Sequence, residues 1–222
     1  MDNYIIKITD YTKEFKENIP LKNINLKLAK GKIYAFIGHN GSGKSMLFKA
    51  ICGFIKPTKG TVEICGKIIG KDIYFPDNVG VLIENCGFIP NLTAVENLNI
   101  LAQIQNKITI QDIKNTLELV GLDPENKKSV KKYSLGMKQK LAIAQAIMEK
   151  QEIIILDEPM NGLDRDSVLN IRNLLLNLKS EGKTILLASH NENDIVFLAD
   201  EIFELNAGTL IEKQRDVSVS DG

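Results

Sequence analysis

A glycine-rich octapeptide at residues 38–45 constrains the fold of this chain more than any other feature. It reads Gly-His-Asn-Gly-Ser-Gly-Lys-Ser and fits the phosphate-loop pattern G-x-x-x-x-G-K-[ST]. The apolar run 33–37 before it is typical of a buried strand, and the run 46–51 after it predicts the start of a helix. Because the motif requires this order of strand, loop and helix, we favour a phosphate-loop α/β core over a chance glycine-rich turn.

The loop carries the groups that polyphosphate binding needs. Its backbone N–H groups can surround the phosphates, and the helix that follows directs its positive end at them. We expect Lys44 to reach the β- and γ-phosphates and Ser45 to hold Mg²⁺. The predicted nucleotide-binding residues are those of the whole loop: Gly38, His39, Asn40, Gly41, Ser42, Gly43, Lys44 and Ser45.

Composition limits the other classes of function. The 222 residues include 28 basic and 28 acidic side chains, so the net charge is zero and no strong field favours nucleic acid or an anionic membrane. Three cysteines without a C-x-x-C pair indicate reduced thiols rather than a metal cluster. No run of about 18 apolar residues is present, and the N-terminus has no signal-peptide pattern, so we expect no segment to span a bilayer.

The order of apolar runs predicts one α/β domain at 1–215 with an inserted helical part. A nucleotide-binding core with an N-terminal β subdomain is expected at 1–84 and 151–215. A helical subdomain is expected at 85–150, where the periodicity becomes helical, and 216–222 is expected to be a frayed tail. Strands are predicted at 5–9, 24–28, 33–37, 61–64, 79–83, 153–156 and 184–188, and a further helix at 168–178.

Two carboxylates follow the apolar run 153–156, which is typical of a strand buried on both faces. In phosphate-loop NTPases an aspartate at such a strand tip holds Mg²⁺, and Asp157 fits this role. Glu158 would then face the γ-phosphate, where a carboxylate can orient and deprotonate the attacking water. The alternative is an acidic cap on a strand end, and the presence of the phosphate loop about 110 residues earlier favours the catalytic interpretation.

Two further segments are candidates for the same chemistry. His190 follows the predicted strand 184–188, and ligands bind at the carboxyl ends of strands in α/β sheets. A lone histidine is more often structural, so only this position favours contact with the γ-phosphate. Ser134 is a good N-cap for the helix that follows it, and this helix start is a second possible anion site. Two helix N-termini would crowd one phosphate, so the two elements are expected to meet across a subunit boundary.

Taken together, these segments resemble an ATP-binding cassette (ABC) ATPase over almost the whole chain. Residues 133–137, Tyr-Ser-Leu-Gly-Met, resemble the signature sequence, residues 159–164 resemble the D-loop, and His190 matches the switch histidine. The resemblance adds Phe15 as the aromatic that stacks on adenine, and Gly136 beside Ser134 as a nucleotide contact.

Three residues in two motifs depart from the commonest family pattern. Glu84 stands where a glutamine usually links the γ-phosphate to the helical lobe, and Leu135 and Met137 replace the usual glycine and glutamine of the signature. Both departures resemble the branch that contains bacitracin- and lantibiotic-type peptide export and immunity ATPases. Glu84 would still be able to bind Mg²⁺ or water, so the expected metal-binding residues are Ser45, Asp157 and Glu84.

The resemblance implies the partners and the mechanism. Two cassettes dimerise head to tail, with ATP and Mg²⁺ held between Lys44 and Ser45 of one subunit and Ser134 and Gly136 of the other. Glu158 is the implied base and His190 stabilises the transition state. The membrane domain would be a separate permease subunit, with this chain cytoplasmic and attached to the inner face of the cell membrane. The alternatives are a soluble ABC ATPase in a mechanical or assembly role and a regulatory module that binds ATP without turnover; no nucleic-acid partner is expected.

Overall fold

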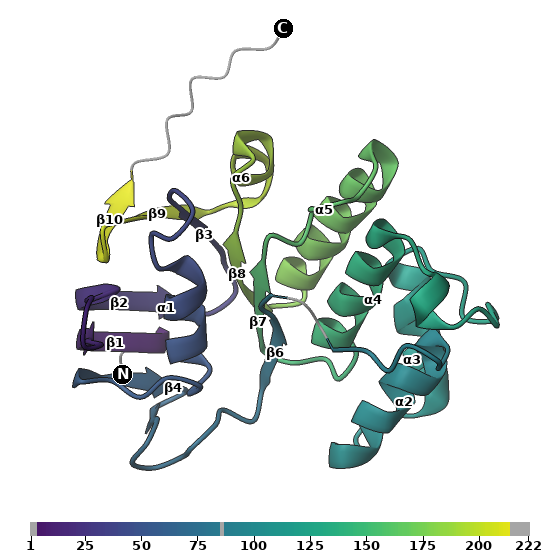
Figure 1. Cartoon of the computed structure of the whole chain (residues 1–222), viewed down its shortest axis with the longest axis horizontal. Helices are drawn as coiled ribbons and strands as arrows, with labels where there is room; N and C mark the ends of the chain where they lie inside the picture. Colours follow the sequence, from purple (N-terminus) through teal and green to yellow (C-terminus); the bar gives the residue numbers. More distant parts are fainter. Residues whose placement is uncertain (1–3, 85–86, 214–222) are drawn as a thin grey trace, which may run out of the picture.

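The structure is a computed structural model of the chain and describes residues 4–84 and 87–213. It contains a four-stranded sheet, a six-stranded sheet and a group of helices (Figure 1). The predicted class, an α/β core with an N-terminal antiparallel β part and an inserted helical part, is confirmed. The phosphate-loop segment lies where expected, between a strand and a helix.

The four-stranded sheet has the order β2-β1-β4-β5 and is antiparallel throughout. Ile8 of β1 pairs with Leu26 of β2 on one side and with Val62 of β4 on the other, and all three side chains are buried. This alternation buries one face of the sheet, as is usual for antiparallel sheets. The strands are β1 (Tyr4–Lys13), β2 (Leu21–Ala29), β4 (Lys59–Ile64) and β5 (Lys67–Ile68).

The six-stranded sheet has the order β10-β9-β3-β8-β7-β6. Its strands pair in parallel except β9 and β10, which form an antiparallel hairpin at one edge. The carboxyl ends of β3, β8 and β7 therefore meet at one edge of the sheet, where ligands bind in this class of fold. The strands are β3 (Ile33–Ile37), β6 (Val79–Leu82), β7 (Ile153–Asp157), β8 (Thr184–Ala188), β9 (Glu201–Asn206) and β10 (Thr209–Lys213).

Both faces of the six-stranded sheet are buried, and each packs into a different hydrophobic cluster. In β7, Ile153 and Ile155 pack into the cluster that α1 shares with the antiparallel sheet. Ile154 and Leu156 point the other way, into the cluster formed with the helices. Since successive strand side chains alternate between faces, a continuous apolar run is the expected sequence for such a strand.

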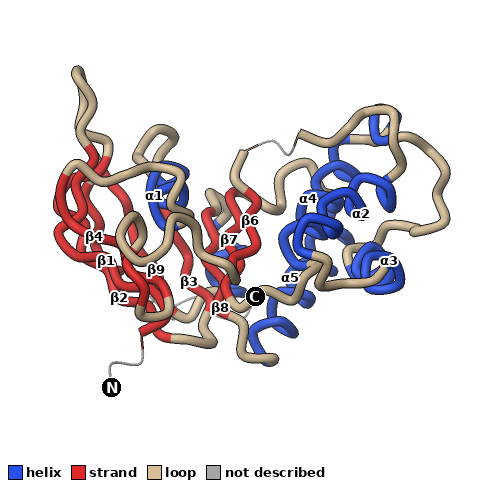
Figure 2. Tube along the Cα trace, turned by 90° about the horizontal axis from the view of Figure 1, so that it is seen from below, coloured by secondary structure: helices blue, strands red, loops and turns tan. Residues whose placement is uncertain are grey.

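The helices lie on both sides of this sheet. Helix α1 lies between the two sheets, whereas α2 to α5 gather on the opposite face (Figures 1 and 2). Helices α2 and α3 begin with capping boxes at Thr93 and Thr109, which satisfy backbone N–H groups of the first turn. The helices are α1 (Lys44–Ile51), α2 (Ala94–Gln105), α3 (Ile110–Leu119), α4 (Leu135–Ile147), α5 (Arg165–Ser180) and α6 (Glu192–Leu198), with a short 3₁₀ helix at Val130–Lys132.

The predicted strands and helices are present, with longer bounds in several cases. The sequence analysis did not predict β5, β9, β10 and α6. Strands β5 and β10 lie at sheet edges, β9 lies next to the edge strand β10, and α6 is a helix of 7 residues. The division of the domain into subdomains stays a prediction. Its boundary at residue 85, the residues 214–215 of the core and the tail 216–222 lie outside the described residues.

Candidate functional site

The glycine-rich loop leaves the end of β3 and enters α1 directly. Gly38 has φ +145°, and a Cβ there would lie 2.3 Å from the carbonyl oxygen of Leu205, so a larger residue would displace the backbone. Gly43, the N-cap of α1, has φ +111° and makes no side-chain cap, and α1 has no acidic residue in its first turn. The loop therefore presents the positive end of a helix without an internal anion, which suits a phosphate group.

Lys44 is folded back over this loop. Its Nζ donates hydrogen bonds to the carbonyl oxygens of Gly38, at 2.7 Å, and His39, at 3.3 Å. Burial lowers the pKa of the Lys44 ammonium, and the nearby carboxylates of Glu158 and Asp157 oppose this shift. A buried lysine held by carbonyl oxygens has few partners that match its charge, so an anionic phosphate would improve its environment.

A hydroxyl and a carboxylate meet beside the start of α1. Ser45 Oγ donates a 2.5 Å hydrogen bond to Asp157 Oδ2, across 112 residues of sequence. Strand β8 lies between β3 and β7, so the loop and helix that follow β3 lie near the end of β7, and Ser45 meets Asp157 there. Mg²⁺ prefers hard oxygen ligands and is commonly bound by one or two carboxylates with phosphate oxygens. This pair of oxygen donors next to the phosphate loop therefore fits a magnesium ion.

Glu158 and His190 form the second polar pair of the site. His190 Nε2 lies 2.9 Å from Glu158 Oε1, and the two residues follow the adjacent strands β7 and β8. Burial raises the pKa of the Glu158 carboxyl, and the adjacent His190 opposes this shift. Glu158 also has a left-handed backbone, with φ +52°, which is uncommon for a residue with a side chain. Strain and desolvation at one carboxylate are typical of a functional position.

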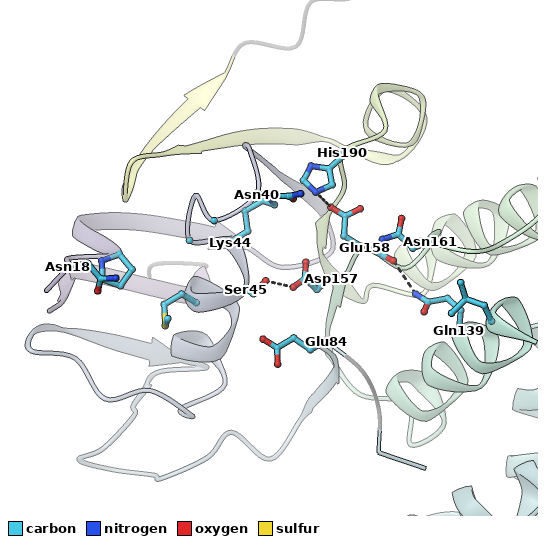
Figure 3. Close-up of a pocket in the computed structure, with 15 residues that line it drawn as sticks. Asn18, Asn40, Lys44, Ser45, Glu84, Gln139, Asp157, Glu158, Asn161 and His190 are labelled. Carbon is cyan, nitrogen blue, oxygen red and sulfur yellow. Dashed lines mark hydrogen bonds and ion pairs between the residues drawn. The ribbon is translucent and has the colours of Figure 1, made fainter. Parts of the chain in front are cut away.

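One cavity of about 570 Å³ contains all of these polar groups (Figure 3). The side chains of Lys44, Ser45, Asp157, Glu158 and His190 face the same space. The cavity brings together nine of the predicted site residues, namely Asn40, Gly41, Gly43, Lys44, Ser45, Glu84, Asp157, Glu158 and His190.

Glu84 lines this cavity from the side opposite to His190 (Figure 3). Its Oε1 forms a 2.5 Å ion pair with Nζ of Lys49 in α1, rather than joining the Ser45 and Asp157 pair. The carboxylate is largely exposed, so release from Lys49 would cost little, as for most surface ion pairs. Its role as a metal ligand stays a prediction.

Six predicted nucleotide-binding residues lie outside the lining of the cavity, namely Gly38, His39 and Ser42 of the loop and Phe15, Ser134 and Gly136 elsewhere. Phe15 is exposed on the segment between β1 and β2, and Nζ of Lys13 lies 4.9 Å from its ring centroid. Ser134 caps α4 by accepting a 3.2 Å hydrogen bond from the backbone N–H of Met137. Gly136 packs against Gly162, whose carbonyl oxygen would lie 2.8 Å from a Cβ at position 136. An exposed Ser134 away from the phosphate loop is compatible with contact to a second subunit.

Six lining residues were not identified from the sequence. Gln139 has the clearest contact, because its Nε2 donates a 3.0 Å hydrogen bond to the backbone carbonyl oxygen of Glu158. It lies four residues after Leu135 in α4, and residues at this spacing share a helix face, so helical periodicity from the signature would have found it. Leu135 and Asn161 belong to the segments that resemble the signature sequence and the D-loop, although neither was named as a site residue, and Asn18, Pro20 and Met46 give no such signal. The six are Asn18, Pro20, Met46, Leu135, Gln139 and Asn161.

Comparison with protein families agrees with the nucleotide-binding site that this geometry indicates. The sequence profile described as "ABC transporter" matches residues 21–161, from the start of β2 through the segment after Glu158. The chain belongs to the ABC transporter family. It is the ATP-binding, ATP-hydrolysing component of that family, as its loop, acidic strand and histidine indicated.

The relatives of this ABC ATPase include ATP-binding proteins named for bacitracin and lantibiotic transport. It is 42% identical over 217 residues to an uncharacterised ABC transporter ATP-binding protein of Bacillus subtilis (strain 168), covering 98% of this chain and 100% of that protein. It is 41% identical over 220 residues to the bacitracin transport ATP-binding protein of Enterococcus faecalis, covering 98% of this chain and 70% of the relative. A lantibiotic transport ATP-binding protein of Streptococcus pyogenes is 35% identical, with 96% and 93% covered. The predicted resemblance to this branch is confirmed.

A solved structure confirms the cassette fold. A dimeric ATP-binding cassette in a post-hydrolysis state, bound to ADP and Pi, superimposes with a TM-score of 0.85 at 26% identity. The alignment covers 94% of this ABC ATPase and 98% of that chain. Among the residues described here, no helix has the length and apolar character needed to cross a membrane.

Proposed function

We propose that this ABC ATPase energises the export of a peptide antibiotic or toxin by a separate permease subunit. The observation that carries the proposal is the single cavity that contains Lys44, the Ser45–Asp157 pair and the Glu158–His190 pair. Bacitracin and lantibiotic transport in the named relatives supports the class of substrate. Attachment to the permease would hold the chain at the cytoplasmic face of the membrane.

Within this proposal, the loop residues bind the ATP phosphates through backbone N–H groups and the Lys44 ammonium. Ser45 and Asp157, with Glu84, would hold Mg²⁺, which neutralises phosphate charge when it is bound. Glu158 accepts a proton from the attacking water, and its raised pKa brings it closer to a base that operates near neutral pH. His190 fixes the Glu158 carboxylate and donates to charge that develops on the γ-phosphate.

The proposal includes a head-to-tail dimer of cassettes. Ser134 and Gly136 do not line the cavity of their own chain, and the solved relative is described as dimeric. A second subunit would place its Ser134 hydroxyl and the N-terminus of its α4 over the γ-phosphate. Opening of this dimer after hydrolysis would transmit work to the permease.

The test is to solubilise native membranes in mild detergent, capture the tagged chain and identify the proteins that accompany it. The expected result is a polytopic membrane protein in stoichiometric amount, with Mg-ATPase activity that increases when a bacitracin- or lantibiotic-type peptide is added. A Lys44→Ala capture serves as the control, because it should retain the permease without activity. Recovery alone or with soluble partners only would instead support the second candidate, an ABC ATPase with a mechanical or assembly role.

A further inference from the structure

An ion pair between a partly buried arginine and a buried aspartate lies behind the segment that carries His190. Asp194, in the first turn of α6, is 1% exposed and accepts two hydrogen bonds from Arg172 of α5. The Nε and Nη2 atoms of Arg172 donate to the same oxygen, Oδ1, at 2.8 and 2.6 Å. The guanidinium also lies over the ring of Phe197, 5.3 Å from its centroid, so the arginine is held from two directions.

The second oxygen of Asp194 extends this contact toward His190. Ser189 Oγ donates a 3.2 Å hydrogen bond to Asp194 Oδ2 and accepts one of 3.1 Å from the backbone N–H of Asn191. Ser189, before His190, is therefore bonded to this buried carboxylate, and Asn191, after His190, is linked to it through the Ser189 hydroxyl. Ser189 is itself buried, so this path is shielded from water.

His190 depends on such backbone support because its own side chain is 46% exposed. Its Nε2 lies 2.9 Å from Glu158 Oε1, and the geometry of this contact follows from the position of the backbone at the end of β8. An exposed imidazole on an unsupported turn would sample several rotamers. A functional side chain must be held to within about 0.5 Å of its productive position, so it needs supporting contacts that fix its orientation.

Stability alone does not explain a buried ion pair in this place. Desolvation of two charges offsets most of their attraction, so an apolar pair of similar volume is often equally stable. Removing one partner, however, leaves an uncompensated buried charge and rearranges its surroundings. Here those surroundings are the segment 189–191, which carries His190.

We propose that Arg172 and Asp194 are positioning residues for His190, acting through Ser189 to keep the imidazole against Glu158. The inference rests on the proposed roles of His190 and Glu158 in hydrolysis. It adds two residues that do not line the nucleotide cavity and do not touch the reacting atoms.

The first experiment is steady-state ATPase kinetics on the full chain. Asp194→Asn and Ser189→Ala should each lower kcat about 10- to 100-fold, the range for loss of contacts that orient a functional side chain. The KM for ATP should stay within about twofold, because the phosphate loop is unchanged. Arg172→Lys keeps the positive charge but loses the pair of hydrogen bonds from Nε and Nη2, and it should retain more activity than Arg172→Met. Ser189→Ala keeps the test valid if the Asp194 variant does not fold.

A matched control lies on the same helix. Lys179 of α5 forms a 2.5 Å ion pair with Oδ1 of Asp200, which follows α6 and accepts a hydrogen bond from the backbone N–H of Ile33 with its other oxygen. Lys179→Met removes an ion pair between the same parts of the fold and should leave kcat unchanged. A loss of kcat in Lys179→Met equal to that in Asp194→Asn would overturn the proposal, because the loss would then follow from weaker packing of α5 and not from the position of His190.

A double-mutant cycle separates positioning from independent effects. If Asp194 acts through His190, Asp194→Asn should change kcat by less than about twofold in a His190→Ala background. If the decreases in kcat caused by Asp194→Asn and His190→Ala multiply in the double variant, the inference is contradicted, while the catalytic role of His190 stands. Wild-type kcat in His190→Ala would instead remove His190 from the mechanism, and the positioning role would fall with it.

A spectroscopic readout does not depend on turnover. The chain contains two histidines, His39 and His190, so their imidazole Cε1–H resonances can be assigned by substitution. Asp194→Asn should move and broaden the His190 resonance and leave that of His39 in place. An unchanged His190 resonance in a folded Asp194→Asn variant would refute the proposal.

Discussion

Gln139 Nε2 donates a 3.0 Å hydrogen bond to the backbone carbonyl oxygen of Glu158. Gln139 belongs to α4, the helix that Ser134 caps, and Glu158 immediately follows β7. One amide therefore links the helix of the signature sequence to the backbone of the predicted base. A rigid movement of α4 would pull on this carbonyl and change where the Glu158 carboxylate lies.

We predict that Gln139→Ala lowers ATPase turnover about 3- to 10-fold, since losing one hydrogen bond of about 1 kcal/mol corresponds to roughly a fivefold effect. The expected loss is in kcat rather than in ATP affinity, because Gln139 supports Glu158 and not the phosphate loop. The control is Gln111→Ala on α3, where the side chain bonds only to the exposed Asn115. Equal activity in the two variants would show that the link has no catalytic consequence.

Lys44→Ala should weaken ATP binding at least about 30-fold, which corresponds to the 2 kcal/mol or more typical of losing a buried charge contact. Lys44 as a whole residue is 7% exposed and its ammonium is held at the loop carbonyls, so no other lysine can replace it without moving the backbone. Isothermal titration calorimetry with a non-hydrolysed ATP analogue measures the change. Lys56→Ala, an exposed position after α1, is the control and should bind normally. Unchanged affinity in Lys44→Ala would contradict the phosphate-loop argument.

Glu158→Gln should lower turnover about 10²- to 10⁴-fold, the usual contribution of a general base, while ATP still binds. The amide keeps the shape of the side chain and its place beside His190 but cannot accept a proton from water. Single-turnover hydrolysis measures the chemical step directly. Near-normal turnover in Glu158→Gln would exclude Glu158 as the base.

The same substitution should stabilise the protein at alkaline pH. Burial raises the pKa of the Glu158 carboxyl, so the folded state binds this proton more tightly than the unfolded state does. The charged carboxylate therefore destabilises the fold above its raised pKa, and this effect disappears below the ordinary pKa of glutamate, about 4.3. Urea midpoints of Glu158→Gln should exceed those of the wild type at pH 8, and the gap should close as the pH falls toward 4.

Glu96 provides a control of opposite sign. Hydrogen bonds from the backbone and side chain of Thr93 lower the pKa of the Glu96 carboxyl. Its charged form therefore stabilises the fold above the ordinary pKa, and this stabilisation is lost as the pH falls through the lowered value. Glu96→Gln should be less stable than the wild type at pH 8. A decrease for both variants would show that the burial of Glu158 does not penalise its charge.

The parts of the fold and site that the sequence predicted are those encoded within one segment. The run 33–37 with the loop 38–45, and the run 153–156 with its two carboxylates, each combine strand pattern and chemistry within about ten residues. Parallel pairing then brings them together, because β3 and β7 both flank β8. Topology rules for α/β sheets supply that step without any knowledge of side-chain contacts.

What could not be predicted depends on contacts between distant segments. Strands β9 and β10 are mixed in polarity, so their places follow from pairing, of β9 with β3 and of β10 with β9, rather than from pattern. The partner of Glu84 is Lys49 of α1, and 35 residues of sequence separate the two. Arg172 and Asp194 are ordinary charged residues on two helices, and only the fold shows that both lie behind His190.

The last prediction concerns the second subunit. Ser134 is exposed at the N-terminus of α4 and lies outside the cavity of its own chain, as expected for a group that contacts ATP bound to a partner. Glu158→Gln with Mg-ATP should therefore form a dimer of twice the 24.7 kDa chain mass, because slow hydrolysis preserves the ATP that joins the subunits. Sedimentation velocity with and without ATP measures this association.

Adding Ser134→Glu to that variant should abolish the dimer, since a carboxylate at the start of α4 would face the negative γ-phosphate of the partner. Ser129→Glu is the matched control, because Ser129 lies on the same lobe and its side chain does not cap the 3₁₀ helix that it precedes. We expect the Ser129 variant to dimerise with ATP as Glu158→Gln alone does. Dimers that survive Ser134→Glu, or that form equally without ATP, would mean that the subunits associate through another surface. The site would then have to be complete within one chain, and the cavity that lacks Ser134 would have to support hydrolysis unaided.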